Sequence, residues 1–271
     1  QRSSPTVRYI SLWTLLPLSV RAAGVILSIL LLLCMVAAFA WSEQLPVWIS
    51  KILYGTGTAW VFIFLYLLLA FLLLDLAGLA FPSIKPYFMH QWSGTIAIGV
   101  ALVIIFGYGR WHYEQKKRVT LDLKTTKHLE QPLKIVMVSD LHLGYTIGKS
   151  ETEKWAEKIN AEHPDIILIA GDIVDFSLRP LEKCDMFSAL HRLKAPLGVY
   201  ACSGNHDVMA RADRQADFHA KTGIRFLNDE TVLADNRIYI VGRRDRSYSH
   251  RKPLGDLLKG LDRGKPVILL D

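Results

Sequence analysis

Cysteine is scarce in this sequence, with three residues among 271. They stand at positions 34, 184 and 202, and no pair of them has the spacing of metal ligands. An odd number of cysteines also argues against a disulfide framework. We therefore expect all three to be small buried apolar residues without a covalent or metal-binding role.

The sequence also lacks internal repeats, low-complexity stretches and any basic stripe that is interleaved with aromatic residues. The net charge is nevertheless +7 and the isoelectric point about 9.3. Proteins that bind nucleic acids usually combine such a charge with a clustered basic face. Because the second half of the chain has no such face, we expect nucleic acid not to be a partner.

Long apolar runs, in contrast, are abundant in the first half of the chain. The hydrophobic share is 51%, and nearly all of the excess lies before Arg110. Three runs have the length, or the flanking tryptophans, of membrane-spanning helices: residues 22–40, 58–80 and 94–108. The short stretch Gly55-Thr-Gly57 is predicted to lie in a polar loop. We predict a membrane region over residues 1–109 with about three transmembrane helices.

Basic residues at the ends of the apolar runs bear on the orientation. Six follow the last run: Arg110, Lys116, Lys117, Arg118, Lys124 and Lys127. Such a cluster binds anionic membrane lipids and also acts as a topology signal. With Lys51, it slightly outweighs the opposite side (Arg2, Arg8, Arg21 and Lys85). We predict a multi-pass protein of the cell (inner) membrane whose soluble domain is cytoplasmic. A further span upstream would account separately for the basic residues at each end of the apolar region.

The second half of the chain alternates between strand-type and helix-type segments. A basic linker, residues 110–132, contains a first predicted strand at 119–123. Strands are then predicted at 134–139, 165–170 and 197–203, and helices at 151–162, 181–194 and 208–222. This alternation implies parallel βαβ units. Shorter strands (224–227, 230–234, 237–242), a helix at 254–261 and a terminal strand indicate a second, mixed sheet. The fold class is α/β over residues 133–271.

Three polar segments each follow one of the long predicted strands. They are Asp140-Leu-His142, Gly171-Asp172-Ile-Val-Asp175 and Gly204-Asn205-His206-Asp207. Parallel strands end at one edge of a sheet, so these segments should converge where open α/β sheets place their sites. A turn or a helix cap would explain each segment taken alone. Their regular separation, roughly 30 residues or one βαβ unit, favours a shared site.

The residue types in these segments suit two divalent cations about 3.5–4 Å apart. Asp140 and His142 offer a carboxylate and an imidazole, which suit Mn²⁺, Fe or Zn²⁺. The two oxygens of Asp172 can bridge both ions, and Asn205 offers a neutral oxygen to the second. His206 can stabilise or protonate a leaving oxygen. This combination is used in hydrolytic phosphate chemistry.

A second set of candidate residues follows a later predicted strand. Arg243, Arg244 and Arg246 could hold a substrate phosphate through two parallel hydrogen bonds. The alternative interpretation is a solvated loop.

On the three polar segments, the chain resembles the calcineurin-like metallophosphoesterases, and its apolar runs are similar to those of their membrane-anchored bacterial branch. The resemblance implies an α/β/β/α sandwich with a two-metal phosphoesterase site. Asp140 and His142 would bind one metal, Asp172 would bridge, and Asn205 would hold the second. His206 would be the catalytic residue at the leaving group. Asp175 and Asp207 would contact the ligands rather than the metals and would orient those ligands.

The remaining motifs of that family are absent from the 271 residues. A further His after a late strand and a Gly-His-x-His segment are missing, and the chain stops at Asp271 after the apolar run Pro266–Leu270. We therefore expect a fragment cut at both ends that lacks the C-terminal part of its domain. The fragment is expected to be inactive, and the intact protein active.

The sequence thus predicts a membrane-bound phosphoesterase that hydrolyses phosphomonoesters, phosphodiesters or pyrophosphates by a hydroxide bridging two metals. Its position near a membrane suggests a lipid-linked or headgroup phosphate as the substrate. The alternative is a non-catalytic membrane scaffold or sensor that keeps the fold without the chemistry.

Overall fold

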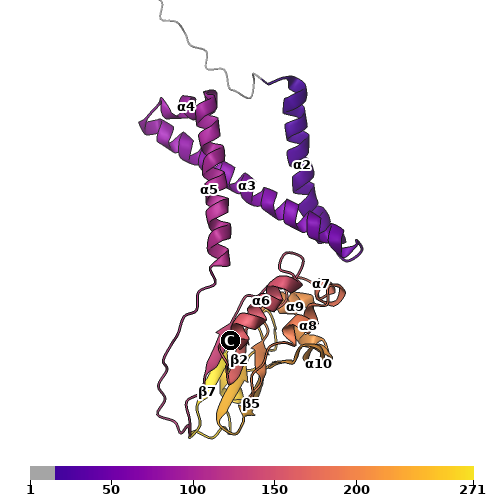
Figure 1. The fold of residues 1–271 in the computed structure, drawn as a ribbon, viewed down its shortest axis with the longest axis vertical. Helices are drawn as coiled ribbons and strands as arrows, with labels where there is room; N and C mark the ends of the chain where they lie inside the picture. Colours follow the sequence, from indigo (N-terminus) through magenta and orange to yellow (C-terminus); the bar gives the residue numbers. More distant parts are fainter. Residues whose placement is uncertain (1–15) are drawn as a thin grey trace, which may run out of the picture. The chain divides into compact units, whose positions relative to one another are not determined.

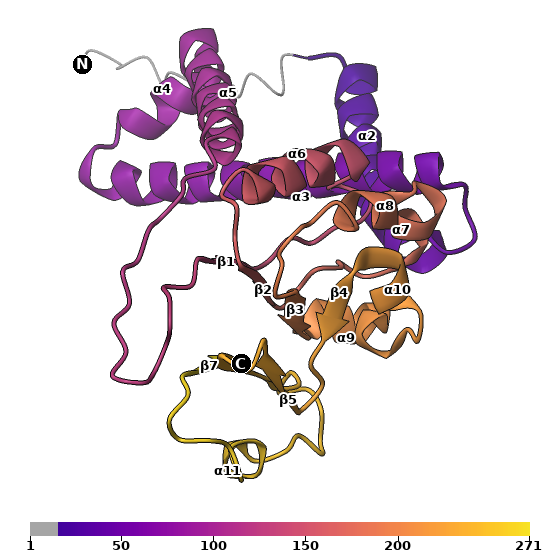
Figure 2. The same ribbon diagram turned by 60° about the horizontal axis from the view of Figure 1, so that its bottom comes forward.

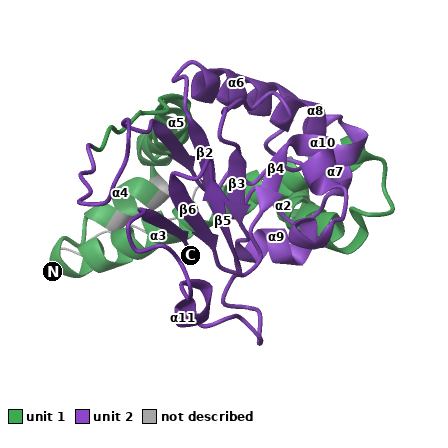
Figure 3. Ribbon diagram, turned by 90° about the horizontal axis from the view of Figure 1, so that it is seen from below, with its two compact units in different colours: residues 1–121 green, residues 122–271 purple. Residues whose placement is uncertain are grey.

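The chain forms two compact units in a computed structural model that describes residues 16–271. The division falls between Leu121 and Asp122, and Figure 3 shows the two units in different colours. Arg2 and Arg8, two of the basic residues from which the membrane orientation is predicted, lie outside the described residues. The domain boundaries expected at residues 109 and 132 stay predictions.

The first unit is helical (Figure 1). Its helices are α2 (Leu18–Trp41), α3 (Val47–Ala80), α4 (Ile84–His90) and α5 (Trp92–Glu114). Within the described residues, α2, α3 and α5 are long and apolar enough to cross a membrane. At 1.5 Å per residue even α5 is about 35 Å long, against a hydrocarbon thickness of about 30 Å. The prediction of three long hydrophobic helices is confirmed.

The stretch Gly55-Thr-Gly57 was wrongly predicted to be a loop. It lies inside α3, which begins at Val47 rather than near Thr58. A Cβ atom on Gly57 would come within 2.8 Å of the backbone and Cβ atoms of Met35. The glycine therefore permits the close contact of α3 with α2, as small residues do between membrane helices.

The predicted strand at residues 119–123 is also wrong. This stretch is neither helix nor strand, and every residue from 114 to 128 is exposed. Apolar alternation stabilises a strand only where a neighbouring strand and a core are available to pair with it. Among the described residues, neither sheet includes this segment.

The second unit contains a four-stranded parallel sheet in the order β1-β2-β3-β4. The strands are β1 (Ile135–Val138), β2 (Ile166–Ala170), β3 (Val199–Cys202) and β4 (Ile224–Phe226). Strand β2 is buried on both faces: Ile167 and Ile169 pack towards the helices, and Ile166 and Leu168 towards the second sheet. This continuous apolar run is typical of parallel strands.

Short helices cover one face of this sheet and the second sheet covers the other (Figure 2). The helical elements are α6 (Lys149–Asn160), α7 (Arg179–Lys183), α8 (Met186–Leu190), α9 (Asn205–Ala210), the 3-10 turn η1 (Ala212–Arg214) and α10 (Phe218–Thr222). The single helices predicted at 181–194 and 208–222 are wrong. Asp185 and Arg211 have positive φ angles, 52° and 58°, and each ends the regular helix.

The second sheet consists of β5 (Glu230–Ala234), β6 (Ile238–Gly242) and β7 (Val267–Leu270). Strands β5 and β6 are antiparallel, whereas β6 and β7 are parallel. The prediction of a second, mixed sheet is confirmed. Helix α11 (Leu254–Leu257) contacts this sheet, where Thr231 Oγ1 donates to the Leu257 carbonyl at 2.8 Å. The prediction of an α/β domain that follows the apolar helices in the sequence is thus confirmed.

The register of the first sheet brings the three polar segments to one edge. Val138 of β1 is level with Ile169 of β2, and Ala170 of β2 is level with Cys202 of β3. The loops that follow these strands therefore begin side by side, as expected at the carboxyl edge of a parallel sheet.

Candidate metal centre

Asp172 is the point at which the three loops are joined. The Asp140 amide donates to the Gly171 carbonyl at 3.2 Å, and the His142 amide donates to the Asp172 carbonyl at 2.9 Å. The His206 amide donates to Asp172 Oδ1 at 2.9 Å. These bonds fix the loops after β1 and β3 to the loop after β2.

Three residues at this edge have a left-handed backbone conformation. The φ angles are 55° at Asp140, 44° at His142 and 54° at Asp172. Non-glycine residues seldom adopt such angles, each of which costs on the order of 1–3 kcal/mol, and those that do cluster at functional sites. The strained backbone turns these side chains towards a shared region at the ends of the strands.

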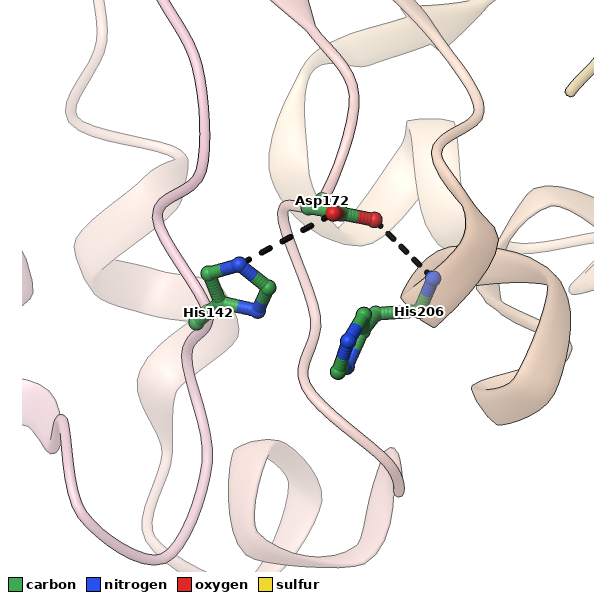
Figure 4. A group of neighbouring side chains, drawn as sticks. All are labelled: His142, Asp172 and His206. Carbon is green, nitrogen blue, oxygen red and sulfur yellow. Dashed lines mark hydrogen bonds and ion pairs between the residues drawn. The ribbon is translucent and has the colours of Figure 1, made fainter.

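His142, Asp172 and His206 form a group that could hold a metal ion (Figure 4). One ligand atom from each lies within 4.8 Å of the others. His142 Nε2 is 3.7 Å from Asp172 Oδ2, too long for a hydrogen bond. Two atoms bound to one ion at about 2.1 Å can be up to about 4 Å apart. The spacing and the imidazole–carboxylate chemistry therefore fit a divalent metal.

Asp140 and Asn205 lie at the margin of this group. Asp140 Oδ1 is 3.7 Å from His142 Nε2, and its side chain is 66% exposed. Asn205 is exposed at the first residue of α9, directly before His206. The structure thus places the Asp140 carboxylate near His142, and it places Asn205 next to His206 in the chain.

Asp175 orients the two histidines. Its Oδ1 atom is 2.9 Å from His206 Nδ1 and 3.7 Å from His142 Nδ1. Partial burial raises the pKa of Asp175, and the neighbouring His206 partly offsets this rise. Because a carboxylate only accepts hydrogen bonds, Nδ1 of His206 is the donor, which leaves Nε2 as the ring atom for other chemistry.

Asp207 is completely buried and ties two of the loops together. Its Oδ1 accepts from the Val174 amide at 2.9 Å, and its Oδ2 accepts from the Gly204 amide at 3.0 Å. Burial raises the pKa of Asp207 to about 6, although these amide bonds act in the opposite direction. The side chain therefore serves to hold the loops after β2 and β3 at a fixed separation.

Gly204 has a role that sequence reasoning missed. A Cβ atom at this position would lie 2.2 Å from Asp172 Oδ1 and 2.6 Å from the Asp172 amide nitrogen. Only glycine lets the third loop approach Asp172 so closely. The glycine in the Gly-Asn-His-Asp segment was the available signal, but the sequence does not show which atom it approaches.

Phe176 was also missed. Its ring centroid is 4.8 Å from that of His206, and the His142 ring meets His206 edge-on at 4.6 Å. The two contacts confine the His206 imidazole. No feature of the sequence separates Phe176 from other aromatic residues near strand ends.

The arginines predicted to hold a substrate phosphate are engaged in ion pairs. Arg243 Nη1 is 2.9 Å from Asp271 Oδ2, and Arg244 Nε is 4.0 Å from Asp229 Oδ2. Both Nε atoms are buried without a hydrogen-bond acceptor. The loop that carries them touches the end of β3, where the Asp245 amide is 3.4 Å from Ser203 Oγ.

Taken together, the fold and the site define an α/β domain with a metal-ligand cluster at the carboxyl edge of its parallel sheet. Residues 133–266 match the model of the family "Calcineurin-like phosphoesterase". This part of the chain belongs to that family.

Similar proteins carry the same domain. An uncharacterized metallophosphoesterase of Aquifex aeolicus is 34% identical over 146 residues, which are 51% of this chain and 54% of that protein. A "Transmembrane protein with metallophosphoesterase domain" of Danio rerio is 36% identical over 75 residues, 28% of this chain and 17% of that protein. The UDP-2,3-diacylglucosamine pyrophosphatase LpxG of Chlamydia trachomatis is 39% identical over 90 residues, which are 33% of this chain and 26% of that protein.

The chain spans at most about half the length of these three relatives. The family and its relatives support a phosphoester hydrolase in general, and the His–Asp group makes a divalent metal plausible for this domain.

Proposed function

We propose that this protein is a membrane-bound phosphoesterase that uses two divalent metal ions, Mn, Fe or Zn. One observation carries the proposal. His142, Asp172 and His206 come from three adjacent strand ends and place side-chain nitrogen and oxygen atoms within 4.8 Å of one another, in a domain of the calcineurin-like phosphoesterase family.

The proposed metal ligands follow from the arrangement of the loops. Asp140 and His142 would hold the first ion, since their side chains approach within 3.7 Å. Asp172 would bridge, because one oxygen faces His142 while the other accepts the His206 amide. Asn205 would hold the second ion with a neutral oxygen, which limits the negative charge gathered at the site.

The chemistry divides between the ions and the protein. Two divalent ions, when bound, neutralise the charge on the phosphate oxygens and lower the pKa of the attacking water. His206 is the proposed catalytic residue and would deliver a proton from Nε2 to the leaving oxygen. Asp175 would hold the His206 ring through the 2.9 Å bond to Nδ1. Asp207 would hold the loops after β2 and β3 at a fixed separation.

Arg243 and Arg244 are proposed to contact the substrate phosphate. The loop that carries them touches Ser203, directly after β3, and the Arg244 side chain is 37% exposed. A phosphate oxygen is the acceptor that arginine pairs with best.

The proposed substrate is lipid-linked. A related enzyme, LpxG, is named as a pyrophosphatase of UDP-2,3-diacylglucosamine, which carries acyl chains. Three apolar helices and a relative named as a transmembrane protein support a location in the membrane. We propose a multi-pass protein of the cell (inner) membrane, with membrane lipids as partners, nucleic acid not a partner, and the soluble domain on the cytoplasmic side.

The proposal is tested with Asp172→Asn in the natural protein, purified in nanodiscs and supplied with Mn²⁺. Hydrolysis of bis(p-nitrophenyl) phosphate and of UDP-2,3-diacylglucosamine should fall at least a hundredfold, because the bridging carboxylate loses its charge. The matched control is Asp217→Asn, an exposed carboxylate that pairs with Lys221. Unchanged circular dichroism would show that the variant still folds.

Wild-type turnover in Asp172→Asn would overturn the proposal. If the unmodified protein bound Mn²⁺ but hydrolysed neither compound, the non-catalytic scaffold or sensor would become the better interpretation.

A further inference from the structure

Residues 244–252, here called the arginine loop, follow β6 and are closed at their base by one buried carboxylate. Asp229, between β4 and β5, is 3% exposed. Its Oδ1 accepts from the Arg244 amide at 3.1 Å, and its Oδ2 accepts from the Lys252 amide at 3.1 Å. Because both ends of the loop are bonded to one side chain, the direction in which the loop leaves β6 is fixed.

The arginine loop also contacts the chain on both sides of His206. Before His206, the Asp245 amide is 3.4 Å from Ser203 Oγ. After it, the Tyr248 hydroxyl donates to Asp213 Oδ2 at 2.6 Å. The loop is therefore tied to the stretch of chain that carries the proposed catalytic histidine.

The first of these contacts places the start of the loop beside the candidate metal centre. Ser203 directly precedes Gly204, and Gly204 lies against the carboxylate and the backbone of Asp172. Arg244 comes directly before Asp245 in the chain. Its side chain therefore starts from a backbone position next to the proposed site, as a contact with a substrate phosphate requires.

The ring of Tyr248 lies against the Arg244 guanidinium. The Cζ atom of Arg244 is 5.0 Å from the ring centroid, within the range of a cation–π contact. The ring is itself held in place, because its hydroxyl donates to Asp213 and accepts from Arg214 Nε at 3.0 Å. Arg214 Cζ also lies 5.0 Å from the ring centroid. Tyr248 therefore offers Arg244 a fixed aromatic surface.

Such a surface matters for an arginine that binds phosphate. A long side chain without fixed contacts samples many rotamers, and ordering it on binding lowers the affinity. Arg244 is held on a second side by Asp229, whose Oδ2 is 4.0 Å from the Arg244 Nε. Because a guanidinium carries five donors in a planar fork, it can keep these contacts and still pair with a phosphate.

We propose that Tyr248 is a positioning residue whose ring holds the Arg244 guanidinium in the orientation that pairs with the substrate phosphate. The hydroxyl bond to Asp213 fixes the ring relative to the segment that carries His206. The inference rests on the proposed contact of Arg244 with the substrate and names the residue that sets the geometry of this contact.

Steady-state kinetics of the natural protein in nanodiscs with Mn²⁺ test this role, with bis(p-nitrophenyl) phosphate as the substrate. Tyr248→Leu removes the ring, Tyr248→Phe keeps it, and Arg244→Gln removes the proposed phosphate contact. The matched control is Tyr239→Leu, at a half-buried tyrosine of β6 whose hydroxyl accepts from the Asp262 amide.

Tyr248→Leu should raise KM at least fivefold and leave kcat within twofold, because it disorders Arg244 and leaves the metal ligands in place. Tyr248→Phe and Tyr239→Leu should stay within twofold of the wild-type KM. In the Arg244→Gln background, Tyr248→Leu should change KM by less than twofold, since it acts through Arg244. The Mn²⁺ affinity, measured by isothermal titration calorimetry, should stay within twofold in all variants.

A fivefold effect of Tyr248→Leu in the Arg244→Gln background would overturn the role of Tyr248, because the two residues would then act independently. An unchanged KM in Tyr248→Leu would also overturn it, and the proposed function would stand if Arg244→Gln raised KM. A parallel loss of kcat and Mn²⁺ affinity in Tyr248→Leu would show a structural role instead. An unchanged KM in Arg244→Gln would contradict the proposed phosphate contact, and with it the role of Tyr248.

Discussion

The residues around Asp172 leave no room for an added side chain. Gly204 lies against both the carboxylate and the backbone of Asp172, while the His142 amide donates to the Asp172 carbonyl and the His206 amide donates to its carboxylate. Metal affinity depends on ligand positions to within a few tenths of an ångström. Small changes here should therefore alter ion binding more than folding.

Gly204→Ala provides a direct measure of this crowding. The new Cβ would clash with Asp172 at 2.2 Å, so the carboxylate must move. We expect Mn²⁺ affinity to fall at least tenfold, measured by isothermal titration calorimetry. Gly255→Ala in α11 is the matched control, because a Cβ there meets no atom within 4 Å. Equal affinities in the two variants would contradict the expected role of Gly204.

Asp207 should contribute mainly to stability. Asp207→Ala would leave the buried amide of Val174 and the partly buried amide of Gly204 without an acceptor. Hydrogen bonds to charged groups contribute about 1.5–3 kcal/mol each, so the free energy of unfolding should fall by about 3 kcal/mol. Urea denaturation measures the change, with the exposed Asp217→Ala as the comparison. A loss below about 1 kcal/mol would show that water replaces the carboxylate.

At the scale of elements, β2 is the strand on which the site depends. It is paired on both sides, by β1 and β3, and its residues Ile166 to Ile169 are all buried. Strand β1, at the edge of the sheet, instead exposes Met137. Because β2 is buried on both faces, the Gly171–Asp175 loop that follows it is held in a fixed position relative to the loops after β1 and β3.

Ile169→Ala should therefore lower the free energy of unfolding by about 2–5 kcal/mol, as expected for a cavity in a packed core. Met137→Ala, on the adjacent strand but 64% exposed, should change it by about 0.5 kcal/mol or less. Urea denaturation of both variants makes the comparison. Similar losses would contradict the burial pattern of the sheet.

At the scale of the whole molecule, the membrane helices and the phosphoesterase domain are separate compact units. In the proposed membrane arrangement, the charges that flank α2, α3 and α5 set the side of the membrane that the domain occupies. The basic residues after α5 favour the cytoplasm under the positive-inside rule.

Cys184 makes this orientation measurable. The prediction that all three cysteines are buried is wrong for Cys184, which is exposed in the second unit, whereas Cys34 lies half-buried in α2 and Cys202 is buried. A membrane-impermeant maleimide should label the protein in permeabilised spheroplasts but not in intact ones, and Cys184→Ser should abolish the labelling. Labelling of intact spheroplasts at Cys184 would place the domain on the outer side.

The sequence determined the fold class, the three apolar helices and the order of most strands, because apolar periodicity and length are local properties of the chain. It also indicated that residues after β1, β2 and β3 share one edge, since parallel strands require it. Tertiary structure alone decided that residues 119–123 have no partner strand among residues 16–271 and that Arg243 and Arg244 pair with Asp271 and Asp229. The approach of Gly204 to Asp172 was likewise set by packing, because such contacts join residues distant in sequence.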